Sequence, residues 1–231
     1  MKTLAGGLTY VRTGSAVRLL PVVLVLPALL VYNWWVFVPL HPGLLRSPNE
    51  LFSNLEVADQ PFANSMHLAD KASGLVLLIA LALIGSTSIP AARLEWLGLA
   101  LFACGGIAGG VYSQVCADEM SSTCRSAEWR LHLPMGHYLH IVAGILEFAA
   151  ITWTLYLAQR RTAGTGSPFA KIYRILAIGI ALAYPVLGIA YLSDHYGAYI
   201  EVVFFVGFTA IVLAQVGERT FPDPDLADIS S

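Results

Sequence analysis

The sequence has little charge: Asp, Glu, Lys and Arg make up 12% of its 231 residues. Soluble domains carry about 25% charged residues, so the soluble globular classes are excluded. Hydrophobic residues make up 57% of the chain, and the mean hydropathy is +0.68. The formal net charge of −2 says nothing about partners by itself. We expect membrane lipid and a membrane protein as partners, and no nucleic acid.

Long uncharged apolar runs are what the sequence has instead. Crossing a membrane takes about 20 mainly apolar residues, and six segments qualify. They cover residues 17–40, 70–89, 96–115, 134–157, 172–193 and 199–216. All should be helices, because backbone amides in hydrocarbon need partners within their own segment. The prediction is an all-α integral membrane protein with a six-helix bundle over residues 17–217, flanked by segments 1–16 and 218–231.

The distribution of Lys and Arg predicts the orientation of the bundle, because basic residues gather on the cytoplasmic side. Nine of the thirteen lie on one side: Lys2, Arg12, Arg18, Arg93, Arg160, Arg161, Lys171, Arg174 and Arg219. The other four are Arg46, Lys71, Arg125 and Arg130. Both termini are therefore expected in the cytoplasm, with the chain passing several times through the inner (plasma) membrane of a bacterial cell.

Histidines cluster on the opposite, outer side of this predicted topology. All six fall there: His41, His67, His132, His137, His140 and His195. Most acids lean the same way, including Asp118, Glu119 and Glu128 in the loop before the fourth span, and Asp194 beside the last. Imidazoles and carboxylates bind metals and move protons, so the outer face is the predicted functional face.

Two helix faces combine these groups at helical spacing. His137, His140, Gly144 and Glu147 share one face of the fourth span. Glu147 lies ten residues beyond His137, about 15 Å deeper into the membrane at 1.5 Å per residue. An ionisable group at that depth is a functional candidate by default, although a protonated Glu making one interhelical hydrogen bond is the plain alternative.

A related pattern begins the second span, where His67, Asp70 and Gly74 have the same spacing. It would present His67 and Asp70 at a depth similar to His137 and His140. Glu201, one turn inside the last span, would face the same pocket.

Cysteine is scarce, with three residues. Cys116 and Cys124 lie eight apart in the second outer loop, where an oxidising compartment would allow a disulfide. Free thiols or metal ligands are the alternatives. Cys104, beside two glycines in the third span, is expected to be a packing residue.

The leading hypothesis is a metal-dependent hydrolase that acts on lipid or a lipid-linked substrate. Zinc, or another divalent metal, would be held by His67, His137 and His140, leaving one position for an activated water. Asp70 or Glu201 would orient a ligand or act as general base, Glu147 is a further catalytic candidate, and Ser65 would polarise water or substrate. The pattern loosely resembles the membrane hydrolase superfamily that includes alkaline ceramidases and adiponectin receptors.

Two alternatives stay open. The chain could be a non-catalytic accessory, assembly or binding protein, with its histidines and acids serving as helix caps and loop anchors. It could also hold a single haem between His67 and His137 or His140, which ranks lowest.

Several segments also resemble a family of six-helix bacterial membrane proteins of unknown function, placed in the Frag1-like superfamily. They are NELFSNLEVADQPFANSMHLADKASG (residues 49–74), VYSQVCADE (residues 111–119) and the closing Gly217, Glu218 and Arg219. The resemblance implies a six-helix membrane fold. Some eukaryotic relatives in that superfamily take part in lipid-anchor remodelling, but the family implies no settled activity.

Overall fold

The structure is a computed structural model of the whole chain. It describes residues 15–41, 43–45, 50–85, 90–118, 121–193 and 197–220. Within those ranges every regular element is a helix, and there is no strand. The predicted terminal segments lie largely outside the described residues.

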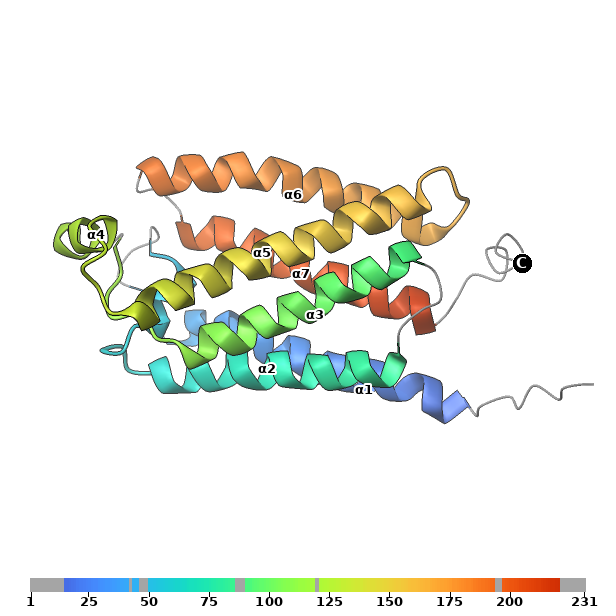
Figure 1. Ribbon diagram of the computed structural model, residues 1–231, viewed down its shortest axis with the longest axis horizontal. Coiled ribbons are helices and arrows are strands. Elements are labelled where there is room, and N and C mark those ends of the chain that lie inside the picture. The colour runs from blue at the N-terminus through green and yellow to red at the C-terminus, as the bar shows by residue number, and fades with distance from the viewer. Residues whose placement is uncertain are drawn as a thin grey trace, which may run out of the picture.

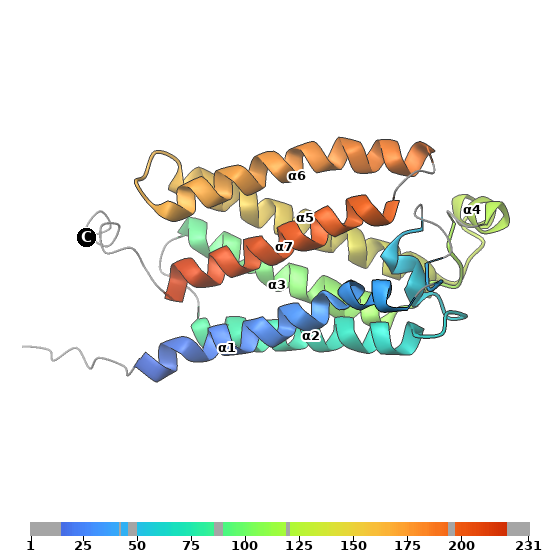
Figure 2. The same cartoon turned by 180° about the vertical axis from the view of Figure 1, so that it is seen from behind.

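Six helices of 18 residues or more run along the described bundle (Figures 1 and 2). They are α1 (Ser15–Tyr32), α2 (Ala63–Ile84), α3 (Pro90–Val111), α5 (Met135–Thr162), α6 (Pro168–Ser193) and α7 (Gly197–Thr220). Shorter helices fill the loops: η1 (Trp34–Leu40), η2 (Phe52–Glu56) and α4 (Ser122–Trp129). We call the end that carries η2 and α4 the disulfide end, and the end where α1 begins and α7 finishes the terminal end.

Five of these helices, α2, α3, α5, α6 and α7, are long and apolar enough to cross a membrane. In α1 the apolar part within the described residues is shorter, Val22–Tyr32. Large apolar side chains point outward along the bundle, as Leu192 (84% exposed) and Leu30 (72% exposed) do. A soluble protein rarely leaves so much apolar surface uncovered, so the exposed side chains indicate a multi-pass membrane protein.

Two helix boundaries differ from the predicted spans in a way that matters for the site. Helix α2 begins at Ala63 rather than at Asp70, so Asp70 lies two turns inside the helix. The first predicted span, 17–40, is divided, because the α-helix ends at Tyr32 and the chain continues as the 3-10 helix η1. Because of this division, Trp34 and Trp35 lie in η1 at the disulfide end, where they pack against the apolar cluster around Phe52.

Glycines let α3 pack closely against its neighbours. A Cβ on Gly110 would lie 2.5 Å from the backbone oxygen of His67 in α2, and one on Gly98 would lie 2.1 Å from the Thr154 hydroxyl in α5. These glycines therefore set the spacing of α2, α3 and α5, as small residues do between membrane helices.

A buried segment of the first loop covers the disulfide end. Phe52 and Leu55 of η2 pack with Val38, Met66 and Ala198 into a small apolar cluster. Glu201 of α7 accepts a hydrogen bond from the backbone N–H of Phe52 at 2.5 Å. The loop is therefore held on the bundle by apolar packing and by a carboxylate, which places Glu56 of the same loop inside the molecule.

At the terminal end, a buried charge network joins four helices. Arg161 of α5 donates to both carboxylate oxygens of Glu95 in α3 at 2.7 and 2.9 Å. The same guanidinium donates to both oxygens of Glu218 in α7, each at 2.8 Å. Tyr173 of α6 donates to Glu218, and Gln215 donates to Glu95. In the sequence Arg161 is one of the basic residues that predict the orientation, and no spacing pattern there predicts this network.

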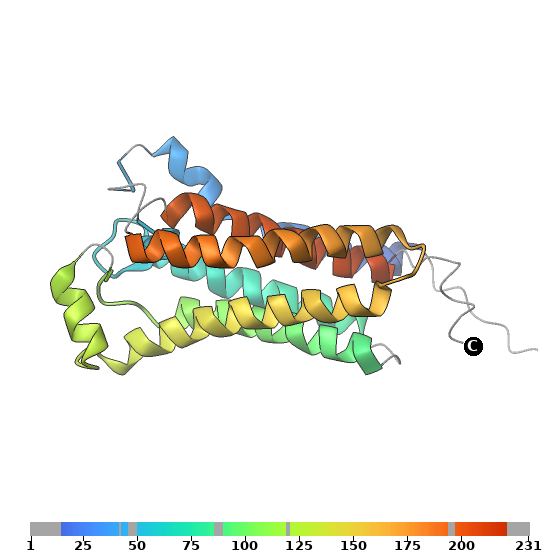
Figure 3. The same cartoon turned by 90° about the horizontal axis from the view of Figure 1, so that it is seen from above.

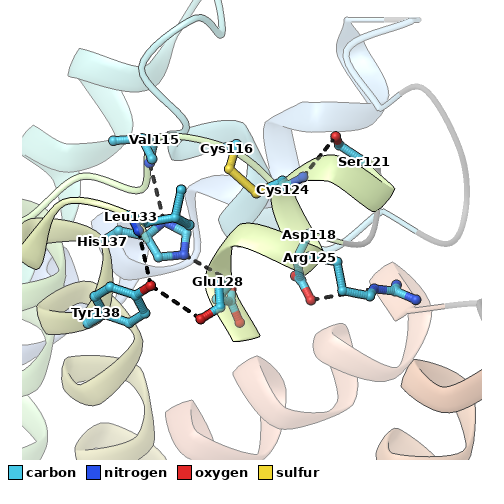
Figure 4. Close-up of a disulfide and its surroundings, with 10 residues drawn as sticks. All are labelled: Val115, Cys116, Asp118, Ser121, Cys124, Arg125, Glu128, Leu133, His137 and Tyr138. Carbon is cyan, nitrogen blue, oxygen red and sulfur yellow. Dashed lines mark hydrogen bonds and ion pairs between the residues drawn. A yellow bond between two sulfur atoms is a disulfide. The ribbon is translucent and has the colours of Figure 1, made fainter. Parts of the chain in front are cut away.

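The predicted disulfide joins Cys116 to Cys124 (Figure 4). It closes the loop onto α4, whose first turn is capped by the Ser121 hydroxyl accepting from the N–H of Cys124 at 3.2 Å. Cys104, predicted to be a packing residue, is a free thiol on an exposed position of α3.

Candidate functional site

A cavity of about 560 Å³ lies in the half of the bundle nearer the disulfide end. Elements far apart in sequence line it: α1, η1, η2, α2, α3, α5, α6 and α7 all contribute. Most of its surface is apolar or aromatic, from residues such as Tyr32, Phe148, Tyr184 and Phe205. A mainly apolar cavity with a few converging polar groups is the usual form of a small-molecule site.

Four carboxyl groups line this cavity: Glu56, Asp70, Glu147 and Glu201. His140 is the one imidazole among the lining residues, and no Lys or Arg of the described chain contributes to the wall. Three of these acids, Asp70, Glu147 and Glu201, were predicted site residues, and the structure brings them to one space. Glu56 was not predicted, because nothing in its local sequence shows that a polar loop folds inward.

Glu56 and Asp70 form a carboxyl pair joined by a side-chain hydrogen bond. Two carboxyl groups can share a hydrogen bond only if one of them holds a proton. Trp34 of η1 donates its indole N–H to Oδ1 of Asp70 at 3.3 Å. Burial raises the pKa of Glu56 well above its usual range, and the nearby charges of Asp70, Glu147 and Glu201 raise it further.

One oxygen of this pair has no hydrogen-bond partner. Oε2 of Glu56 is buried without one, and so is Nδ1 of His67. The two atoms lie 3.4 Å apart, while Nε2 of His67 bonds to the Ser113 hydroxyl at 3.1 Å. Buried polar atoms in proteins nearly always have a partner, and these two form an ion pair when His67 is protonated. The pair joins η2 to α2.

Glu147 packs closely against α3 because two glycines there have no side chain in its way. A Cβ on Gly105 would lie 2.8 Å from Cγ of Glu147, and one on Gly106 would lie 3.2 Å from its Oε1. The two glycines therefore make the room that lets this carboxyl reach the cavity.

His137 lies apart from the cavity, among the residues of the second loop (Figure 4). Its Nδ1 accepts from the backbone N–H of Val115 at 3.4 Å, so its Nε2 carries the proton and bonds to Glu128 at 3.0 Å. The backbone oxygen of Glu128 also accepts a hydrogen bond from the Tyr138 hydroxyl. With both ring nitrogens engaged, His137 fixes the loop that carries the disulfide.

The other two predicted metal ligands also have protein partners. Nδ1 of His140 lies 3.0 and 2.8 Å from the backbone oxygens of Gly109 and Tyr112, so Nδ1 carries the proton and donates to them. The Nε2 atom then holds the free lone pair of this ring. The rings of His67 and His140 lie 6.4 Å apart, edge to face. Across the described part of the chain, no three His, Cys, Asp or Glu side chains are grouped so that they could hold a metal ion.

Two further predictions concern residues elsewhere. Ser65 is exposed and lies on a separate apolar pocket of about 170 Å³ with Phe37, His41 and Phe62, away from the carboxyl groups. Asp194, His195 and Glu119 lie outside the described residues.

A comparison with protein families identifies relatives of the whole bundle. The model of the family described as "Protein of unknown function (DUF998)" matches residues 4–216. The chain belongs to the DUF998 family. No curated protein and no solved structure matches this DUF998 protein. Family membership therefore supports a membrane protein and leaves its chemistry to be argued from the cavity.

Proposed function

We propose that this DUF998 protein binds a lipid or lipid-linked molecule in the acid-lined cavity. The observation that supports this most strongly is the cavity itself, with four carboxyl groups at its polar part and a long apolar wall. A polar region joined to an apolar one matches an amphipathic molecule. The resemblance to the Frag1-like superfamily, with its lipid-anchor remodelling members, agrees with such a ligand and is part of the proposal.

The cavity has an opening that suits a lipid. Its wall includes Ile141, Ile145 and Ala149 of α5 together with Tyr184 and Leu187 of α6. These two helices meet at the terminal end and diverge toward the disulfide end, as two views show (Figures 1 and 3). Ile145 is 62% exposed on the bundle surface while also lining the cavity. A ligand would therefore enter sideways from the membrane, between α5 and α6.

The proposal includes the topology that the basic residues predict. All six long helices would cross the plasma membrane of a bacterial cell, with both termini in the cytoplasm and the disulfide end outside. An outer compartment is where a disulfide persists, and this supports the assignment. Reporter fusions after Gly164 and within α4 would test it, because only the second should lie outside.

Gly144 allows a direct test of the cavity. It lines the cavity, and a Cβ built on it meets nothing within 4 Å, so Gly144→Leu should fill the space without moving the helices. Gly179→Leu is the matched control, because Gly179 is an exposed α6 glycine with equally open surroundings and is absent from the cavity wall. Native mass spectrometry of purified protein should show bound lipid in the wild type and the control and none in Gly144→Leu. Equal lipid in all three would contradict the proposal.

Hydrolysis of the bound molecule is a second candidate, favoured by the Glu56–Asp70 pair. The ionised carboxylate would accept a proton from water as the water oxygen attacks an ester carbonyl carbon. The protonated carboxyl would donate its proton to the departing alkoxide oxygen. A fluorescent phospholipid should then yield fatty acid with the wild type and with Asp59→Asn, a neighbouring exposed acid, but not with Asp70→Asn. Absence of product from the wild type would remove this candidate.

An assay in the presence of a chelator distinguishes this route from the metal-dependent hydrolase predicted from the sequence. The carboxyl pair needs no ion, so product formation should persist in EDTA. Loss of product in EDTA, together with its return on adding zinc, would support the metal-dependent version instead.

A further inference from the structure

Ser113, His67 and Glu56 form a chain of contacts beside the cavity. They come from three parts of the chain: η2 carries Glu56, α2 carries His67, and Ser113 follows the end of α3. We propose that they act as a nucleophile, its general base and a residue that orients the base, in the hydrolysis of a carboxylic ester. The inference rests on the proposed function, since the ester belongs to the molecule bound in the cavity, and it names a serine as the attacking group.

The contacts have the order that an activated serine requires. The Ser113 hydroxyl lies 3.1 Å from Nε2 of His67, and Nδ1 of the same ring lies 3.4 Å from Oε2 of Glu56. A nucleophile within reach of a base, with the base oriented by a third group, is the geometry of serine hydrolases on unrelated folds. Such contacts are often longer before substrate binds, as the second distance is here.

The Glu56 carboxylate determines which ring nitrogen carries the proton. An ionised carboxylate oxygen only accepts hydrogen bonds, so Nδ1 of His67 carries the proton and faces Glu56. Nε2 then has the free lone pair and accepts the O–H of Ser113. In the Glu56–Asp70 pair, which shares a hydrogen bond, a proton on Asp70 leaves Glu56 as the ionised member. When Nε2 takes a proton the ring becomes a cation, and the carboxylate beside it stabilises that cation.

Close packing of α2 and α3 brings the serine to the histidine. A Cβ on Gly110 would lie 2.5 Å from the backbone oxygen of His67, so the missing side chain lets α3 end this close to α2. Ser113 follows three residues later, after α3 has ended at Val111. His67 is 6% exposed and Ser113 is half-buried, so the base is shielded from water while the hydroxyl stays accessible.

The cavity wall next to Ser113 gives an ester access to the hydroxyl. Gln114 follows Ser113 and lines the cavity, as do Gly109 and His140. An ester bound there would place its carbonyl next to Ser113, with its hydrocarbon chain along the apolar wall. The Gln114 side-chain amide is a hydrogen-bond donor on that wall, and it would bind the carbonyl oxygen as the oxygen becomes negative.

The reaction has two balanced steps. Oγ of Ser113 attacks the ester carbonyl carbon while its proton passes to Nε2 of His67. That proton then passes to the departing alkoxide, so an alcohol leaves and the acyl group stays on Ser113. Water attacks the acyl-serine in the same way and gives its proton to Nε2, from which it returns to Oγ as the carboxylic acid leaves. Ester and water are the two reactants, and the serine is regenerated.

A fluorophosphonate with a long alkyl chain tests the serine, because its phosphorus is attacked by an activated serine Oγ with loss of fluoride. Purified wild-type protein is incubated with it, and the modified peptide is identified by mass spectrometry. We expect a single adduct, on Ser113, in the wild type. The control variant Ser53→Ala, which removes a serine on the cavity wall, should give the same adduct. Absence of an adduct from the wild type, or an adduct on Ser53 in place of Ser113, would overturn the inference.

Two variants separate the nucleophile from the residue that orients its base. Ser113→Ala should give no adduct and should not hydrolyse the fluorescent phospholipid, and unchanged hydrolysis would overturn the inference in favour of direct attack by water. Glu56→Gln should lower the maximal labelling rate about a hundredfold and leave the probe concentration for half-maximal rate unchanged, which a loss of folding would not do. A wild-type rate in Glu56→Gln would overturn the role of Glu56. The proposed function fails separately, by wild-type protein carrying no lipid that Gly144→Leu removes.

Discussion

Replacing Arg161 by alanine should destabilise the bundle more than any other single change at its terminal end. The guanidinium makes four hydrogen bonds of 2.7–2.9 Å to Glu95 and Glu218. The Glu95 side chain is fully buried and that of Glu218 is 10% exposed. Removing this cation leaves both carboxylates buried without their main donor, and the nearby cation that remains is Arg219, 3.7 Å from Glu95.

The magnitude follows from what buried pairs cost when one partner is removed, about 3–5 kcal/mol. The Arg161 side chain is 21% exposed, so water still reaches the network, and Gln215 and Tyr173 keep one hydrogen bond to each carboxylate. Both facts reduce the loss, and we expect about 3 kcal/mol in the free energy of unfolding. Reversible unfolding in detergent and SDS mixtures, followed by circular dichroism, would measure it.

Arg160 provides the matched control one residue away. It is exposed, and its contacts within the described part of the chain are a hydrogen bond of 3.0 Å to Tyr156 and the face of that ring. Arg160→Ala should therefore cost less than about 1 kcal/mol. Arg219 lies 3.7 Å from Glu95 and belongs to the same network. A quadruple variant with Arg161→Met, Arg219→Met, Glu95→Gln and Glu218→Gln removes all four charges and should be more stable than Arg161→Ala alone. Equal losses for Arg160→Ala and Arg161→Ala, or a quadruple variant weaker than the single one, would refute the reasoning.

Three further predictions concern the other half of the bundle. Burial raises the pKa of Glu56 in the folded state, so its contribution to stability is complete below the unfolded pKa and declines as pH rises above it. The decline should be at most about 1.4 kcal/mol per pH unit, and a Glu56→Gln variant with the wild-type slope would contradict this. Gly110→Ala should separate α2 from α3 and lower the midpoint of thermal unfolding, whereas Gly109→Ala, whose Cβ meets nothing within 4 Å, should not; equal midpoints would count against the packing argument. Replacing Cys116 and Cys124 by serine should cost about 2.5 kcal/mol for a loop of this length, measured by unfolding with and without reductant, and a double variant as stable as wild type would exclude that role.

The helical architecture was accessible from the sequence because apolar runs of 20 residues have few alternatives. The disulfide was accessible for a similar reason, since Cys116 and Cys124 share one loop. The start of α2 was not. A hydropathy pattern begins the span at Asp70 and leaves His67 outside it. In the bundle His67 turns inward and is almost fully buried, so the helix begins earlier, at Ala63.

The partners of the site residues were also beyond the sequence. His137 and His140 share a helix face as predicted, yet His137 bonds to Glu128 of the short α4 and His140 to backbone oxygens of α3. Which neighbour a histidine meets depends on how loops fold over the bundle, and periodicity carries no information on that. For the same reason Glu56, four residues after the buried Phe52 of η2, was missed, although it became the central residue of the site.

Mapping where a bound lipid touches the protein tests the central claim most directly. A phosphatidylethanolamine with a photoreactive group in its acyl chain would be cross-linked to the purified protein, and the labelled peptides identified by mass spectrometry. The account predicts labels concentrated at residues 141–149 of α5 and 184–187 of α6, and their loss in Gly144→Leu. Labels spread evenly over outward positions such as Leu182 and Leu192, unchanged by Gly144→Leu, would contradict it.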